Sequence, residues 1–430
     1  MHETIITEKA NPVATVYDHK KDLQLSLQLN RWMLELIGAW PKSTISWTER
    51  YAYRLLNVIC TSLISFLVIP AVVCIVLEMN DSYIILKLSG ALSFCVLAVV
   101  KYSSLIFHEK DIRRGIEHIE SDWINTRHYG DRTIMIRSAK FGRRLVAICA
   151  FFMYGGAVFF YLALPFSVGK ITESDGNLTY RPLVYPVARA IVDVRYSPVS
   201  EIFFWVQCLS GFLAHSITAT GCSLAAVFAM HAYGRMEILI RWIEHLLNGR
   251  KDLCDNMDER LAMIVEQHIR VLRFIALTDK ILREISVVEV VQCTVSMCLL
   301  GYYTLMVCIS YKMYVPCKAH CYFEEWESKE TTSYITYIVL LLSFTFNIFI
   351  FCYIGELVAE KCKKIGEVSY MIDWYRLSGR KGLDVVLMIA MSNASIKLTA
   401  GNLFELSFST FGDVIKTSVA YFNMLRTLNI

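Results

Sequence analysis

The chain has 430 residues, 55% of them hydrophobic and only 19% charged, and its mean hydropathy is +0.43. Because a soluble domain carries about 25% charged residues, this composition excludes a protein that is soluble throughout. It is typical of a chain that lies largely within a membrane.

The N-terminal segment, residues 1–54, carries charges throughout and contains no long apolar core, so we expect no cleavable signal peptide. Within it, residues 27–41 (LQLNRWMLELIGAWP) have the pattern of a short amphipathic helix. Such a helix either lies along the membrane surface or packs on a helical bundle, and the sequence leaves both arrangements open.

Apolar residues are concentrated in blocks, and a helix needs about 20 residues to cross a bilayer core. The blocks are residues 55–77, 83–107, 145–168, 202–230, 285–311, 334–355 and 385–428. Segments of this kind cross lipid as helices, because only then are their backbone polar groups satisfied within the segment. We therefore predict an all-α membrane protein with seven transmembrane helices in a single domain, residues 1–430.

Two of the connecting segments are long and charged, namely residues 109–144 and 231–284. Both repeat apolar residues at i, i+3 and i+4, which is helical periodicity. We expect them to extend the transmembrane helices beyond the membrane and to pack on one another as an anchor domain.

The last apolar block is too long for one crossing. As a helix rising 1.5 Å per residue, the 44 residues 385–428 would measure about 66 Å, against a hydrocarbon core of about 30 Å. A break near Ala400–Gly401 divides it, leaving residues 385–400 at the cytosolic level and residues 401–428 as the seventh crossing. This second half is semi-polar, so its polar face meets either a water-filled pore or the interior of its own bundle.

Basic residues give the expected orientation. The N-terminal segment and the loops after the second, fourth and sixth crossings hold 31 Lys and Arg, whereas the other loops and the C-terminal tail hold 8. The positive-inside rule therefore predicts a cytosolic N-terminus and an extracellular C-terminus.

Two glycosylation sequons, at Asn80 and Asn177, fall in loops expected outside the cell. The outer loop that follows the fifth crossing contains Cys317 and Cys321, which form either a local disulfide or two free thiols. The spacing of a zinc site is missing, and we expect neither a metal nor a cofactor.

Four stretches resemble the insect odorant receptors. They are the C-terminal TFGDVIK and TSVAYFNMLR (residues 410–426), FCYIGELVAEKCKKIGEVSYMIDWY (351–375), YSPVSEIFFWVQ (196–207) and NRWMLELIGAWP (30–41). Each motif is loose, but they occur in the family's order and together extend over nearly the whole chain. The resemblance implies a ligand-gated, non-selective cation channel, not an enzyme, that sits in the plasma membrane of olfactory sensory neuron dendrites. It also implies a heterotetramer with the odorant co-receptor (Orco), with the cytosolic helices forming the contact between subunits, and no need for a G protein or nucleic acid.

In that family the last helix lines a central pore, and its gate lies three and seven residues after the motif tyrosine. Here the tyrosine is Tyr421, so the gate positions are Met424 and Leu428. They are spaced i, i+4 on one helical face, as a ring of apolar plugs requires. Thr417 continues this face inward, and Asp413 either lines the inner vestibule or pairs with Lys416 on the next turn.

The family also implies an odorant pocket in the outer half of the membrane, between the second, third, fourth and sixth crossings. Its affinity for a volatile would come from burial of apolar surface. Gln207 and Tyr337 are the candidates that could orient a carbonyl or hydroxyl group, although ordinary helix packing is the more common role for any one candidate. The candidates are Tyr83, Leu86, Gly90, Met153, Gly156, Phe160, Phe204, Gln207, Cys208, Gly211, Tyr337 and Leu341.

Two alternatives stay open. A gustatory-type channel of the same superfamily usually carries Gln-Phe in its final helix, where this chain has AYFNMLR. A G-protein-coupled receptor requires the opposite orientation, and its motifs are misplaced, because ERY occurs before the first crossing, at residues 49–51.

Overall fold

A computed structural model describes the chain over ten segments. They are residues 19–41, 47–169, 171–172, 179–180, 183–188, 192–249, 256–314, 323–377, 381–394 and 397–427. Four residues singled out from the sequence, Asn177, Cys317, Cys321 and Leu428, lie outside these segments, whereas Asn80 lies exposed between the first two long helices.

The elements follow one another along the chain as helices interrupted by two small hairpins. The N-terminal half contains α1 (His19–Leu36), α2 (Trp47–Glu78), α3 (Ser82–Phe107), α4 (Glu109–Asn125), α5 (Tyr129–Val158), the π-helical turn η1 (Phe159–Ala163), α6 (Leu164–Val168), β1 (Ile171–Thr172) and β2 (Thr179–Tyr180). The C-terminal half contains α7 (Val199–Glu244), α8 (Met257–Tyr314), α9 (Phe323–Met371), the 3₁₀ turn η2 (Trp374–Arg376), α10 (Lys381–Asn393), β3 (Thr399–Ala400), β4 (Phe404–Glu405) and α11 (Phe408–Thr427).

The predicted all-helical membrane architecture is confirmed. Within the described segments, six helices are long and apolar enough to cross a bilayer, namely α2, α3, α5 with η1 and α6, α7, α8 and α9. The six expected crossings between residues 55 and 355 lie inside them. Helix α11, expected to form the seventh crossing, is not among these six, although its 20 residues span about 30 Å.

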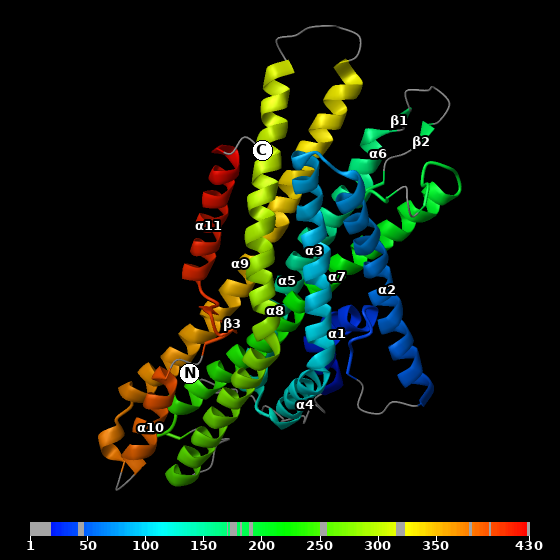
Figure 1. Cartoon of the computed structure of the whole chain (residues 1–430). Coiled ribbons are helices and arrows are strands. Elements are labelled where there is room, and N and C mark those ends of the chain that lie inside the picture. The colour runs from blue at the N-terminus through cyan, green and yellow to red at the C-terminus, as the bar shows by residue number, and fades with distance from the viewer. Residues whose placement is uncertain are drawn as a thin grey trace, which may run out of the picture.

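The segments between the crossings are helical too. Helix α4 and the first half of α5 occupy the expected loop 109–144, and the ends of α7 and α8 occupy most of 231–284. Figure 1 shows these extensions, together with α10, gathered at the end of the molecule opposite the β1–β2 hairpin.

Helix α7 forms the centre of the bundle. It packs against α1, α2, α3, α5, α8 and α9, and its side chains are buried around almost the whole circumference. Its sequence explains this, because residues 210–234 are rich in Gly, Ala, Ser and Thr, and small side chains let neighbouring helices approach closely.

The N-terminal helix α1 packs on the bundle instead of lying alone on a membrane surface. Leu34 on α1 and Ile37, directly after the helix, are fully buried. Helix α1 contacts α4, α5 and α7. On α7, the Thr220 hydroxyl lies 3.5 Å from the Met33 carbonyl oxygen.

The last apolar block is interrupted where the sequence predicts, and the interruption is a hairpin. Strands β3 and β4 pair antiparallel, with Thr399 opposite Glu405, and Gly401 turns the chain with a φ of +65°. The Asp279 carboxylate on α8 accepts a 2.7 Å hydrogen bond from the backbone N–H of Thr399. This hydrogen bond therefore fixes, relative to α8, the hairpin from which helix α11 begins.

Candidate ligand cavity and channel helix

A cavity of about 650 Å³ lies between α3, the η1–α6 segment, α7, α8 and α9, with residues 183–186 forming one wall. This volume falls within the range of small-molecule sites, about 300–1,000 Å³. The lining is mostly apolar and aromatic. It includes Ile84, Leu88, Phe94, Leu164, Leu299, Leu300, Leu340 and Phe344.

Several polar groups in the wall are already engaged. The Tyr303 hydroxyl donates to the Leu86 carbonyl oxygen at 2.8 Å, and His215 Nδ1 lies 2.9 Å from the carbonyl oxygen of Gly211. The Tyr161 and Tyr185 hydroxyls lie 3.3 Å apart. These contacts hold the wall together and leave those groups less available to a ligand.

Three other polar groups have no hydrogen bond or ion pair with the described part of the chain: the hydroxyls of Ser296 and Tyr337 and the ammonium of Lys87. Tyr337 packs its ring 5.9 Å from that of Tyr303, which directs it to the α8 side of the cavity. These three groups are therefore the ones left available to a ligand that carries a hydrogen-bonding group.

Of the candidates chosen from the sequence, the cavity brings together Gly90, Phe160 and Tyr337. Leu86 and Leu341 are partly buried packing residues outside the lining. The Tyr83 side chain lies outside the described residues.

The candidates on α5 and α7 serve helix packing instead. Met153 is buried in the core, and a Cβ on Gly156 would lie 3.0 Å from Leu340 and 3.1 Å from Ser343. Phe204 packs edge-to-face against Phe166 and Trp205, away from the cavity.

Tyr161 and the segment around Tyr185 lie against the predicted face of α7. A Cβ on Gly211 would lie 2.1 Å from the Tyr161 ring, so the glycine is needed for this close approach. The Cys208 thiol donates to the Tyr161 carbonyl oxygen at 3.5 Å. Gln207 makes two hydrogen bonds to the Tyr185 backbone, at 2.8 and 3.1 Å, so its amide is not free to orient a ligand.

Helix α11 has two different faces. Val414 and Ser418 are buried against the bundle, and the Ser418 hydroxyl donates to the Thr294 carbonyl oxygen on α8 at 3.2 Å. The adjacent, exposed side of the helix carries the residues predicted to line a pore, and all those described are exposed: Asp413, Thr417, Tyr421 and Met424. Leu428 lies outside the described residues.

Helix α8 stands between the cavity and α11. Ser296, Leu299 and Tyr303 line the cavity, whereas Thr294 and Gly301 meet α11, where a Cβ on Gly301 would lie 3.7 Å from the Phe422 ring. Because 3.6 residues make one helical turn, these two sets occupy different faces of the same two to three turns.

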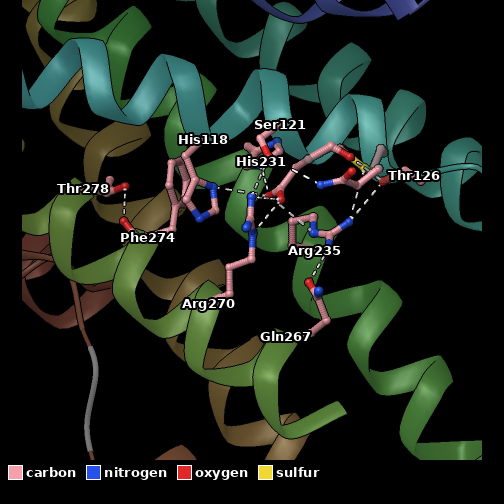
Figure 2. A network of polar contacts seen from close by, with 12 residues as sticks. His118, Ser121, Thr126, His231, Arg235, Gln267, Arg270, Phe274 and Thr278 are labelled. Carbon is pink, nitrogen blue, oxygen red and sulfur yellow. Dashed lines mark hydrogen bonds and ion pairs between the residues drawn. The ribbon is translucent and has the colours of Figure 1, made fainter. Parts of the chain in front are cut away.

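A second polar site lies away from the cavity, around Asp122 on α4 (Figure 2). His231 Nε2 lies 3.0 Å from one carboxylate oxygen, and Arg270 donates to the other at 2.9 Å. Arg235 lies 3.5 Å from the carboxylate and donates to Gln267 at 2.6 Å. The network therefore ties α4 to α7 and α8.

His118, Asp122 and His231 together have the donor atoms of a metal site, within 4.8 Å of one another. Two arginines on the same carboxylate oppose a further cation, so we interpret the cluster as an ion-pair network. Burial alone would raise the pKa of Asp122, but hydrogen bonds from His118 and His231 and the charge of Arg235 outweigh it and lower the pKa well below its usual range.

A sequence model of the family described as "7tm Odorant receptor" matches residues 84–317 and 326–419, which is more than half of the chain. Odorant receptor 10 of Aedes albopictus is 22% identical over 57% of this chain and 60% of its own length. Odorant receptor 22c of Drosophila melanogaster is 27% identical over 22% of this chain and 23% of its own.

Solved structures give the same result for the fold. The insect olfactory receptor OR5 of Machilis hrabei superposes with a TM-score of 0.75 over 96% of this chain and 100% of its own, at 13% identity, in a complex with eugenol. A second structure of the same receptor superposes with a TM-score of 0.74 over 95% of this chain. The helical arrangement and the extended family match lead to one conclusion: this chain is a multi-pass membrane protein that belongs to the seven-transmembrane odorant receptor family.

Proposed function

We propose that this receptor binds a small, largely apolar odorant in the cavity and gates a non-selective cation pore lined by α11, in a heterotetramer with a co-receptor subunit at the dendritic plasma membrane. The observation that carries the proposal is the exposed semi-polar face of α11. A helix in a bilayer does not turn Asp413 and Thr417 to lipid, because each polar group there costs several kcal/mol. That face requires water or another subunit.

The cavity suits a volatile molecule. An odorant that loses about 250 Å² of apolar surface to the wall would gain about 6 kcal/mol. Part of this gain is offset by lost translational and rotational freedom, so selectivity depends on shape and on one or two hydrogen bonds. The hydroxyls of Ser296 and Tyr337 are the groups placed to provide them.

Helix α8 offers a short route from ligand to pore. A ligand that displaces Leu299 or Tyr303 shifts the helix whose opposite side holds Ser418 and Phe422 of α11. Gating requires only that the ligand bind the open arrangement more tightly than the closed one.

The end of the molecule where the helical extensions gather with α10 provides a contact surface for other subunits. Exposed apolar side chains there lie on the end of α9, on η2 and on α10: Tyr370, Met371, Tyr375, Leu383, Val386 and Leu387. At the expected cytosolic level no lipid covers such a patch, and exposed apolar patches of this kind mark protein interfaces.

The proposal is tested by whole-cell recording from cells that express the chain with the co-receptor, screened against a panel of volatiles. An odour-gated cation current is expected. Replacing Ala91 by Phe on the cavity wall should raise the half-activating concentration at least about tenfold, since the added ring fills space the odorant needs.

The matched control is Val100→Phe, which adds a ring to an exposed position on the same helix and should leave the response unchanged. Equal losses in the two variants, with both at the cell surface, would argue against this cavity as the odorant site. Absence of current for a broad panel would contradict the channel assignment.

A further inference from the structure

A second cavity, of about 740 Å³, opens between α5, α7 and α9 near the expected cytosolic membrane surface. It is lined by five cationic side chains and one carboxylate, Glu237. The cations are Arg137, Lys140, Arg144, Arg241 and Lys361. This excess of positive charge distinguishes it from the odorant cavity, whose wall is mostly apolar.

The cations come from one face of each helix. Arg137, Lys140 and Arg144 are spaced i, i+3, i+7 on α5, and Arg241 and Lys361 reach the same cavity from α7 and α9. Lys361 pairs with Glu237 and lies 5.0 Å above the Tyr233 ring.

The other four cations, Arg137, Lys140, Arg144 and Arg241, form no ion pair with the described part of the chain. All four are exposed. Because no carboxylate in that part of the protein pairs with them, the cavity carries an uncompensated positive charge. Such a charge favours an anionic ligand.

The cavity also has an apolar part. Phe141 and Tyr353 pack with ring centroids 6.3 Å apart, and Leu357 and Met230 join them in the wall. Because α5 runs toward the outer end while α7 and α9 run away from it (Figure 1), Tyr353 and Met230 lie nearer the membrane centre than Lys361 and Arg241. On α7 and α9 the lining therefore changes from apolar to cationic toward the expected cytosol, whereas on α5 Arg144 lies nearer the membrane centre than Phe141.

We propose that this cavity binds an anionic phospholipid of the inner leaflet, with a headgroup that carries more than one phosphate, as in phosphorylated inositol lipids. Four unpaired cations match several phosphate charges better than a single one, and arginine binds phosphate bidentately. Basic cavities between transmembrane helices on the cytoplasmic side are suited to such headgroups. The inference rests on the proposed membrane orientation and not on odorant gating.

The test uses the purified full-length chain in detergent micelles and a fluorescent phosphatidylinositol bisphosphate, with binding followed by polarisation. Saturable binding is expected, reversed by the unlabelled lipid and not by phosphatidylcholine. The soluble inositol phosphate headgroup should compete at least about tenfold more weakly, because it lacks acyl chains for Phe141, Tyr353 and Leu357 to contact. Equal competition would mean a site for free phosphates and would overturn the lipid assignment.

Two variants of equal net charge separate a defined site from general attraction. The pair Arg137→Gln and Arg144→Gln removes two lining cations and should weaken binding about tenfold or more, since one charge-assisted hydrogen bond is worth about a factor of ten. The pair Arg143→Gln and Lys363→Gln removes two exposed cations outside the lining and should change binding less than about twofold.

Equal loss in both variants, or no saturable binding by the unmodified chain, would overturn the proposal. The lipid competition needs no substitution, so it decides the question even where a variant folds poorly. The assay uses neither odorant nor current, which separates its failure from failure of the channel assignment.

Discussion

The ion pair between Lys101 on α3 and Glu289 on α8 should be essential for stability. Both side chains are only 1% exposed, so neither charge can be solvated if its partner is removed. Asn347 on α9 donates to Glu289, and Thr218 on α7 lies 3.3 Å from the Lys101 ammonium. The pair thus joins the helices that surround the cavity.

Replacing Lys101 by Met leaves Glu289 buried without its counterion. Breaking a fully buried pair costs about 3–5 kcal/mol. At about 2 °C per kcal/mol, the melting temperature of the purified receptor should fall by about 6–10 °C. Adding Glu289→Gln should recover at least half of the loss, because the remaining charge is then gone as well.

The control is Lys87→Met, which removes a lysine from an exposed position on the same helix and should shift the melting temperature by about 1 °C at most. Melting curves of the detergent-solubilised protein, followed by intrinsic fluorescence, give all four values. A Lys101→Met protein as stable as the Lys87→Met protein would refute the reasoning.

Two further stability predictions follow from the described contacts. Asp122→Asn should lower the melting temperature by several degrees at pH 7, because Arg235 is then buried without an anionic partner. Since the folded-state pKa of Asp122 is lowered, its stabilisation is complete above the unfolded pKa of about 4 and is lost as the pH falls further. The part of the difference that comes from the Asp122 charge should therefore shrink below pH 4, and a difference between wild type and variant as large at pH 3 as at pH 7 would contradict this assignment. Gly355→Ala should cost about 1–3 kcal/mol, because its Cβ would lie 2.2 Å from the Leu406 carbonyl oxygen, whereas Gly155→Ala, with nothing within 4 Å, should be silent in the same melting assay.

Much of the fold follows from local sequence patterns. Apolar blocks place the crossings, and i, i+3, i+4 periodicity predicts the helical extensions formed by α4 and by the ends of α7 and α8. The break at Ala400–Gly401 follows from length alone, although the sequence does not indicate the hairpin that anchors Thr399 to Asp279.

The cavity wall was harder to predict, because it depends on which face of each helix meets which neighbour. Gln207 has the chemistry of a ligand-binding residue, yet its amide is taken by the backbone of Tyr185 in a connecting segment. Ser296, Leu299 and Tyr303 were missed because α8 was not expected to reach the pocket. One signal was present: Lys87, one of two cations in a largely apolar crossing, does line the cavity.

The central claim, that the exposed face of α11 lines an ion pathway, is tested most directly by cysteine accessibility. Single cysteines at Thr417, Met424 and Val414 would be expressed with the co-receptor and treated with a membrane-impermeant cationic thiol reagent during odorant-evoked current. The ten described native cysteines are all buried. Treating the unsubstituted protein with the same reagent controls for reaction at the other native cysteines. We predict block at Thr417→Cys and Met424→Cys and none at Val414→Cys, which faces the bundle. Block at Val414→Cys alone, or at none of the three while current persists, would contradict the assignment of α11 as the channel wall.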